Sequence, residues 1–229
     1  MSMTGTKRER ARDQLLVSTQ SLLTEYNASA LDIRQITTHA GMPHASFFDY
    51  YPDVPALIGE LGELLGATHA AAMIALGNGR DDPAVRFAQN TRQTLRIVAQ
   101  QPVYGHLMFD VGLATDRLGS ELLLRLKFDI GDGVSRGIFV AADIDMAASM
   151  VAGAISGLAL DLHRRVLPVG KIDVATAKLL IFLGLDPSTA ELLSCALIDF
   201  PPPPDLPLRW FALPPCPQWP EADPSQGAG

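Results

Sequence analysis

Apolar residues recur at helical spacing from the start of the chain. Ala11, Leu15, Leu22 and Tyr26 fall close to one face if residues 7–26 form a helix. This spacing predicts a first helix of about five turns, with its apolar side turned towards a core.

Two shorter helices are predicted next. Asp32 can cap a helix start, and Gln35 three positions later completes a capping-box spacing. Gly41 ends that helix, and a third helix is predicted over residues 44–50, ahead of Pro52. A longer helix followed by two short ones joined at a glycine is typical of a three-helix DNA-binding unit.

The remaining pattern is also helical. Asp53 can cap a long helix over residues 54–76. Further helices are predicted over residues 83–101, 103–114, 118–140, 143–166, 174–184 and 187–200. No alternating run exceeds a few residues, so the predicted fold class is all-α.

Three parts follow from this pattern. Residues 1–53 form the predicted helix-turn-helix domain, and residues 54–200 form a larger helical body. Residues 201–229 form a C-terminal extension that holds ten of the 17 prolines and therefore cannot be helical. Its apolar stretch, residues 206–219, is predicted to lie over the body.

Composition narrows the class of protein. Hydrophobic residues make up 48% of the 229 residues and charged residues 19%, which is normal for a globular protein. A net charge of −7 argues against coating by nucleic acid along the whole chain, although one face can still be basic. Two cysteines suggest neither a disulfide framework nor a metal cluster, and no leader or spanning segment is evident, so we expect a cytoplasmic protein.

The segment AGMPHASFFDYYP at residues 40–52, followed by Ala56 and Leu57, carries the most specific signal. It resembles the helix-turn-helix of the TetR (tetracycline repressor) family, which reads approximately A-G-V-S-x-G-x-L-Y-x-Y-F. Ile33, Arg34 and Ile36 agree with the family pattern upstream, and LGLDP at residues 183–187 is similar to the end of the family's body. The resemblance covers residues 8–58 well, residues 143–198 by pattern and residues 80–140 by helix count.

The resemblance, read with the residue chemistry, predicts the DNA-contacting side chains. Gly41 permits the tight turn, while Phe47 and Tyr50 are expected to anchor the recognition helix. Basic and hydroxyl side chains suit phosphate contacts that set the register on DNA. The predicted DNA-binding residues are Lys7, Arg8, Arg10, Arg12, Arg34, His44, Ser46, Phe48 and Tyr51.

Two positions depart from the family pattern. Asp49 lies in the recognition helix, where its charge repels phosphates, and Val54 stands where a lysine is usual. Residues 7–53 hold five Lys or Arg and six Asp or Glu, so this unit is not basic overall. The alternative is a dimeric ligand- or protein-binding module whose helix-turn-helix does not bind an operator.

The resemblance also implies a homodimer on a palindromic operator in double-stranded DNA. In the family, two helices of the body form a four-helix interface, and small residues at Gly153 and Gly157 permit close packing. The predicted interface residues are Gly153, Gly157, Leu158, Ala177 and Ile181. The alternative is that these faces fill the core of one subunit.

The helices between these regions are candidates for an effector site. Bulky apolar residues with a few polar ones among them suit a small, largely apolar ligand, although ordinary core packing gives the same pattern. The predicted ligand-binding residues are His69, Arg96, Tyr104, Met108, Phe109, Leu126 and Phe128. Ligand binding is expected to move the helix over residues 54–76, the expected rigid link to the DNA-binding unit.

No enzyme is predicted. The chain has no HExxH, GxSxG or paired metal-ligand spacing, and its five histidines are scattered, so no cofactor or metal is expected. The predicted function is a ligand-controlled, DNA-binding transcriptional regulator of the repressor type.

Overall fold

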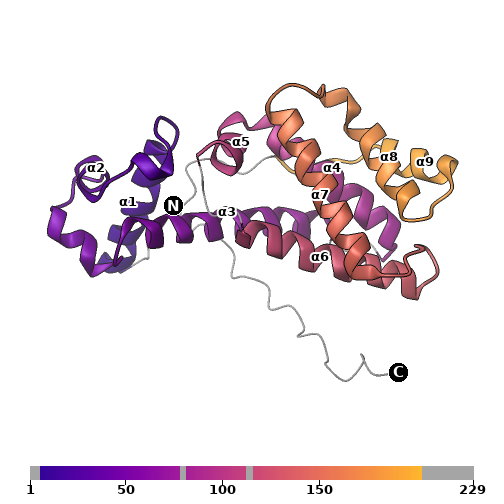
Figure 1. The fold of residues 1–229 in the computed structure, drawn as a ribbon, viewed down its shortest axis with the longest axis horizontal. Coiled ribbons are helices and arrows are strands. Elements are labelled where there is room, and N and C mark those ends of the chain that lie inside the picture. The colour runs from indigo at the N-terminus through magenta and orange to yellow at the C-terminus, as the bar shows by residue number, and fades with distance from the viewer. Residues whose placement is uncertain (1–5, 78–80, 112–115, 203–229) are drawn as a thin grey trace, which may run out of the picture.

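A computed structural model describes residues 6–77, 81–111 and 116–202 of the protein, and within these ranges every regular element is a helix. A small N-terminal unit and a larger body lie at opposite ends of the long helix α3, as Figure 1 shows. The predicted all-α class is therefore confirmed.

The N-terminal unit contains α1 (Lys7–Leu22), α2 (Ile33–His39) and the 3₁₀ turn η2 (His44–Asp49). Thr6 and Glu9 form a capping box at the start of α1, and Asp32 and Gln35 form the predicted one at the start of α2. The first helix is shorter than predicted, because the amides of residues 24 and 25 bond to carbonyls three residues back and tighten the chain into a turn.

Helix α3 (Val54–Gly77) runs from this unit into the body. Asp53 begins it, since its carboxylate accepts a 2.8 Å hydrogen bond from the amide of Ala56. Four leucines of α3 are fully buried: Leu57, Leu61, Leu64 and Leu65. Their spacing of three and four residues gives α3 one continuous apolar face shared by both parts of the molecule.

The body surrounds α4 (Pro83–Gln100), which contacts α3, α5 (Pro102–Phe109), α6 (Asp116–Ser135) and α7 (Ile144–His163). It also contacts α8 (Ile172–Phe182) and α9 (Pro187–Cys195), which pair with each other at the far end of the body in Figure 1. Short 3₁₀ turns, η1 (Ala28–Ala30) and η3 (Val169–Lys171), complete the elements. Because helices cover α4 on several sides, even polar side chains on it are buried.

The end of α6 differs from the prediction. The helix predicted over residues 118–140 ends at Ser135, and Gly137 with φ +69° then turns the chain so that Phe139 packs against Gly133. A Cβ atom at residue 133 would collide with the Phe139 ring, so glycine permits this return rather than a hinge within the helix.

The last described segment, residues 196–202, leaves α9 without forming the predicted helix to residue 200. Arg92 donates to the carbonyl of Ala196 at 2.7 Å, and Gln93 donates to the carbonyl of Pro201 at 3.0 Å. The guanidinium groups of Arg92 and Arg96 lie over the ring of Phe200, 5.0 and 4.6 Å from its centroid. These contacts hold the segment on α4, while the predicted contact of residues 206–219 lies outside the described residues.

Candidate DNA-binding face and effector site

The turn between α2 and η2 has the geometry of a helix-turn-helix. Gly41 adopts φ +63°, the amide of Gly41 bonds to the carbonyl of Thr38, and the amide of Met42 bonds to that of Thr37. This pair of bonds is a Schellman motif, which satisfies the last carbonyls of α2 and requires a residue that tolerates positive φ. Gly41 therefore fixes the angle at which η2 leaves α2.

The 3₁₀ turn η2 presents alternate side chains to the core and to solvent. Phe47 is fully buried, whereas Phe48 is 55% exposed and His44 is exposed, with the His44 and Phe48 rings 6.0 Å apart. Ser46 is half-buried. His44 and Phe48 are thus available on the outer face, as predicted, and Phe47 is the predicted anchor.

Tyr51 corrects the prediction that it faces DNA. Only 4% of Tyr51 is exposed, and its ring packs 5.9 Å from that of Phe47. Arg12 donates from Nε to the Tyr51 hydroxyl at 3.3 Å, and burial raises the pKa of Tyr51, so the phenol stays protonated. Tyr51 is the second anchor, and Tyr50, predicted for that place, is only half-buried.

The predicted basic cluster is divided between two roles. Arg12 forms an ion pair with Glu60 of α3, and Arg8 donates to the backbone carbonyl of Asp49 at 3.4 Å. Lys7 and Arg10 are exposed on α1. Arg12 therefore connects the DNA-binding unit to α3, while Lys7, Arg8 and Arg10 are exposed and Arg8 is also bonded to η2.

Arg34 and His44 come together in an open groove on the N-terminal unit. Both side chains are exposed, and the groove combines residues before and within α2, the first residue of η2 and the start of α3. Its lining residues are Leu31, Asp32, Ile33, Arg34, His44, Val54 and Pro55. Val54, where the family has a lysine, thus gives this groove an apolar wall.

A second connection joins the N-terminal unit to the body, in addition to α3. The amide of Ala28 donates to the carbonyl of Val111 at 2.8 Å, and Nε2 of His106 lies 3.1 Å from the carbonyl oxygen of Leu23. These bonds connect the segment after α1 with the end of α5. The expectation that α3 is the only rigid link is therefore wrong.

His106 belongs to a cluster that reaches α7. Nδ1 of His106 and Nε2 of His163 lie 3.1 and 2.7 Å from the same oxygen, Oδ2 of Asp110. The hydrogen bond from His163, with a second from His106, holds the pKa of Asp110 below its usual range. One carboxylate thus connects α5 with α7, and His106 extends the connection to α1.

Most of the predicted effector-site residues have other roles. Tyr104 is fully buried and donates to the carbonyl of Leu65 at 3.2 Å, and Leu126 is part of the apolar core. Met108 and Phe109 are half-buried. These four side chains can form apolar walls, but they offer no free polar group to a ligand.

Two predicted effector residues lie elsewhere. Phe128 is 56% exposed on α6, so the prediction that it lines an interior site is wrong. Arg96 stacks on Phe200, which draws its guanidinium to the C-terminal segment instead. Neither position could be judged from the spacing along one helix, because each depends on which element packs against it.

His69 remains at the centre of a buried polar cluster. Its Nε2 lies 3.1 Å from the hydroxyl of Thr94, while its Nδ1 is buried and has no hydrogen-bond partner. Burial, together with the positive charge of Arg125, lowers the pKa of His69 to about 4, so the imidazole is neutral near pH 7. Asn90, one turn before Thr94 on α4, also has both amide atoms buried without a partner.

Sequence reasoning did not select Asn90. The signal was present, because Arg86, Asn90 and Thr94 are four residues apart and therefore share a face of α4. Arg86 bonds to α6 and Thr94 bonds to α3, so Asn90 faces the junction of α3, α4 and α6.

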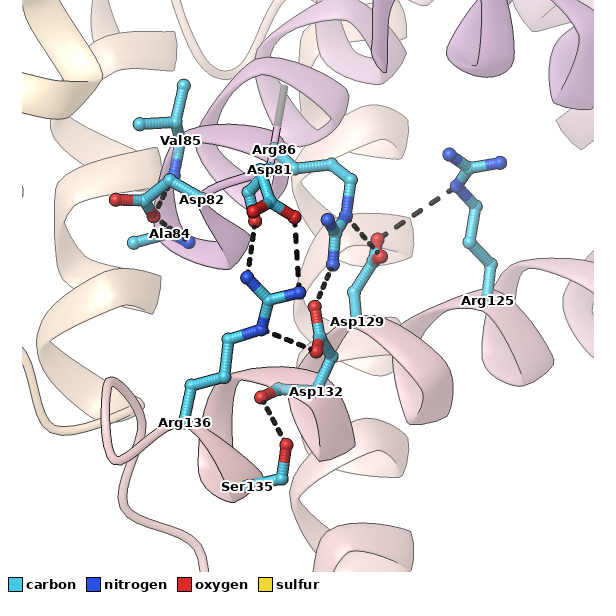
Figure 2. A network of polar contacts seen from close by, with 10 residues as sticks. All are labelled: Asp81, Asp82, Ala84, Val85, Arg86, Arg125, Asp129, Asp132, Ser135 and Arg136. Atoms are coloured by element: carbon cyan, nitrogen blue, oxygen red, sulfur yellow. Dashed lines mark hydrogen bonds and ion pairs between the residues drawn. The ribbon is translucent and has the colours of Figure 1, made fainter. Parts of the chain in front are cut away.

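An ion-pair network closes one end of this junction, as Figure 2 shows. Arg86 bonds to Asp129 at 2.8 Å and to Asp132 at 2.7 Å, and Arg125 lies 3.9 Å from Asp129. Arg136 extends the network to Asp81 and to Asp132. Three arginines thus meet three aspartates, so the charges of the network balance.

The predicted dimer face is exposed on the single chain. Gly153 and Gly157 of α7 are exposed, and a Cβ atom at either would meet nothing within 4 Å. Apolar side chains that are 46 to 60% exposed accompany them on α7 and α8: Met146, Met150, Val174 and Phe182.

The other predicted interface residues are less accessible. Leu158 and Ile181 are half-buried, but Ala177 is only 5% exposed and packs inside the subunit. The prediction that Ala177 lies at an interface is therefore wrong, because its side of α8 faces the core.

Helix α7 is also long and apolar enough to cross a membrane, with a mean hydropathy of 1.3 and 28% of that stretch buried. One such helix is weak evidence for a span, and the exposed apolar face described above accounts for its hydropathy. No three His, Cys, Asp or Glu side chains form a potential metal site in residues 6–77, 81–111 and 116–202.

Comparison with known proteins gives a consistent answer for the fold. Residues 82–194 match the family model described as "Tetracyclin repressor-like, C-terminal domain". No curated protein matches the chain in sequence.

Several solved structures share the architecture. RolR in complex with resorcinol superposes with a TM-score of 0.67 at 24% identity, over 85% of this chain and 98% of that one. NalD from Pseudomonas aeruginosa, a repressor of a multidrug efflux pump, gives 0.63 at 14% identity, over 76% and 97%.

A TetR-family regulator from Pectobacterium atrosepticum gives a TM-score of 0.57 at 18% identity, over 78% of this chain and 94% of that one. At these identities the structures establish the shared fold, and the family model identifies the body. Residues 82–194 therefore form a tetracyclin repressor-like C-terminal domain, and the described chain shares the fold of TetR-family transcriptional regulators.

Proposed function

We propose that the protein is a homodimeric repressor that binds a palindromic operator and releases it when a small molecule enters the body. The observation that carries this proposal is the recognition element η2, which is anchored by Phe47 and Tyr51 and presents His44 and Phe48 outward. An exposed aromatic pair on a turn fixed by Gly41 has no role in the core. Such a surface suits contact with a DNA groove.

DNA contact would rest on few charges. Lys7, Arg10 and Arg34 are exposed cations of the N-terminal unit. Arg8 is exposed but bonds to the carbonyl of Asp49, and Arg12 is paired with Glu60. Asp49 is also exposed and opposes phosphate binding. We therefore expect a shallow salt dependence of operator affinity, corresponding to about three phosphate contacts per subunit.

Binding to fragmented genomic DNA from the source organism, across a salt series, tests this function. A regulator retains discrete fragments that share a palindromic sequence, and the logarithm of its affinity falls linearly with the logarithm of the salt concentration. Retention of no fragment at any salt concentration would contradict the proposal. That outcome would favour the second candidate, a dimeric binding module without an operator, which the exposed Asp49 supports.

The dimer would form through the exposed faces of α7 and α8. Replacing Gly157 with Trp should disrupt it without disturbing the subunit fold, because a side chain there enters open space in the single chain. Gly170→Trp, at another open position outside the two helices, is the matched control. Light scattering should show a monomer for Gly157→Trp and a dimer for Gly170→Trp, and a dimer for both would contradict this interface.

The effector would act through two connections. Movement of α3 changes the position of the N-terminal unit directly, and the bond from His106 to the Leu23 carbonyl carries any shift of α5 to the end of α1. His106→Phe removes that bond. We expect this variant to reduce the effector-induced loss of operator affinity more than it changes operator affinity in the absence of effector. Equal effector responses in His106→Phe and the unmodified protein would restrict the coupling to α3.

The effector site is proposed at the junction of α3, α4 and α6. RolR, which shares the fold, has been solved with resorcinol bound, so a compact aromatic compound is a suitable first probe for this chain as well. We place the protein in the cytoplasm, where an operator and a diffusible metabolite are both accessible. A regulator of this kind acts by binding, and no catalytic step is proposed.

A further inference from the structure

The junction of α3, α4 and α6 contains buried polar atoms that the fold leaves without partners. They are Nδ1 of His69 and both amide atoms of Asn90, and 9% of Asn90 is exposed. Buried polar groups are nearly always hydrogen-bonded in folded proteins, and an unpaired one destabilises the fold. Unpaired donor and acceptor atoms at this junction indicate that another molecule supplies their hydrogen-bond partners.

The two side chains face the same region. Asn90 lies midway between Arg86, which bonds to Asp129 of α6, and Thr94, which bonds to His69 of α3. Arg125 of α6 lies close enough to His69 for its charge to lower the pKa of the imidazole. His69 of α3 and Asn90 of α4 therefore lie on the sides of their helices that face each other, with Arg125 of α6 nearby.

The charges around this junction favour an uncharged ligand. The adjacent arginines and aspartates pair in equal numbers, three of each, and Asp129 is only 3% exposed (Figure 2). His69 is neutral, and the unpaired atoms that His69 and Asn90 offer are an imidazole nitrogen and a carboxamide. A charged ligand would lose its hydration here without gaining a counter-charge that is still free.

From these observations we propose that the effector is an uncharged compound with at least two hydrogen-bonding groups, read by Nδ1 of His69 and the carboxamide of Asn90. This proposal differs from the expectation of a largely apolar ligand. The inference rests on the proposed function for the site, but it concerns the chemistry of recognition and not the response of DNA binding. Resorcinol meets the description, because its two hydroxyl groups can each donate and accept.

Calorimetry on the full chain without DNA tests the proposal with four compounds of similar size. The compounds are resorcinol, the anion 3-hydroxybenzoate, the cation 3-hydroxybenzylammonium and the hydrocarbon m-xylene. We expect resorcinol to bind at least about tenfold more tightly than each of the others, since m-xylene lacks both hydrogen bonds and the two ions lose their hydration without a free counter-charge. Tighter binding of the anion, the cation or m-xylene, or binding of none, would overturn the proposal.

Variants assign the recognition to the two residues. Asn90→Leu should weaken resorcinol binding at least about tenfold, whereas Gln100→Leu, at an exposed position of the same helix, should leave it unchanged. Asn90→Leu should also leave the melting temperature of the ligand-free protein unchanged or raise it, because it removes unpaired buried atoms. A lower melting temperature, or unchanged resorcinol affinity, would show that Asn90 is a structural residue and would overturn the assignment.

Operator binding is measured separately, so the two failures remain distinct. If resorcinol binds through Asn90 but operator affinity is unaffected, the recognition chemistry holds and the regulatory function fails. If the operator is bound and released by a charged compound, the regulatory function holds and the recognition chemistry fails.

Discussion

The recognition element η2 and the central helix α4 place their polar side chains in opposite environments. In η2 the core position is aromatic, Phe47, and the polar residues His44 and Asp49 are exposed to water. In α4 six consecutive polar residues, from Gln89 to Thr94, are buried. The N-terminal surface can therefore exchange partners with water at little cost, whereas polar groups of α4 must be satisfied within the body.

The outer face of η2 is therefore expected to contribute to function, and the surroundings of α4 to stability. A change on the outer face of η2 should alter DNA binding and leave the fold intact. A change to a paired charge near α4 should alter the fold first, because a charge left alone in the interior is strongly unfavourable. Four substitutions test this contrast, in order of decreasing effect.

Arg86→Leu should have the largest effect. It leaves Asp129, which is 3% exposed, without its close partner at 2.8 Å, so the free energy of unfolding should fall by about 3–5 kcal/mol. Arg136→Leu, which removes a side chain that is 41% exposed, should change the denaturation midpoint much less. Similar losses in urea denaturation would show that burial does not govern this network.

Acid should destabilise the body through His69. The pKa of His69 is about 4 in the folded protein and 6.5 in the unfolded chain, so between these values only the unfolded chain takes up the proton. Stability should therefore fall as the pH drops from 6.5 towards 4, by up to about 3 kcal/mol, and this contribution is fully present above pH 6.5.

Two variants isolate the contribution of His69 to the pH dependence of the unfolding free energy. His69→Phe should flatten the pH dependence of the unfolding free energy in that window, whereas His44→Phe, at an exposed site, should not. Other groups, including Asp110 with its lowered pKa, also lose stabilisation in acid, and they do so equally in both variants. A pH dependence unchanged by His69→Phe would contradict the buried, neutral imidazole.

Tyr51→Phe tests the anchor of the recognition element. Loss of the hydrogen bond from Arg12 should lower the unfolding free energy by about 1 kcal/mol, while operator affinity stays the same. Tyr50→Phe, at the adjacent half-buried position, should have a smaller effect on stability. Weaker operator binding by Tyr51→Phe with unchanged stability would restore Tyr51 to the DNA-binding face.

Asp49→Asn should have the smallest effect. Removing one exposed negative charge from η2 should raise operator affinity about threefold at low salt and leave the melting temperature unchanged. Glu191→Gln, an equivalent change on α9, should leave operator affinity unchanged. An unaltered affinity in Asp49→Asn would mean that η2 does not approach the phosphates.

Local signals predicted most of the fold. The capping box at Asp32 and Gln35, the glycine turn at Gly41 and the cap at Asp53 are formed as expected, because each depends on residues at most five positions apart. Helix ends were less accurate where a distant residue decides them. The end of α6 depends on the return of Phe139 to Gly133, and the path after α9 depends on Phe200 meeting Arg92 and Arg96.

The sequence by itself determined the helices, their order and the helix-turn-helix, since hydrophobic spacing and caps act along one segment of the chain. Only the tertiary structure decided which neighbours face inward. It turned Tyr51 to Arg12, left Phe128 in solvent, and left Nδ1 of His69 and the amide of Asn90 without hydrogen-bond partners. The reason is that burial and hydrogen-bond satisfaction depend on the packing of α3, α4 and α6 around one another, which the spacing within each helix does not specify.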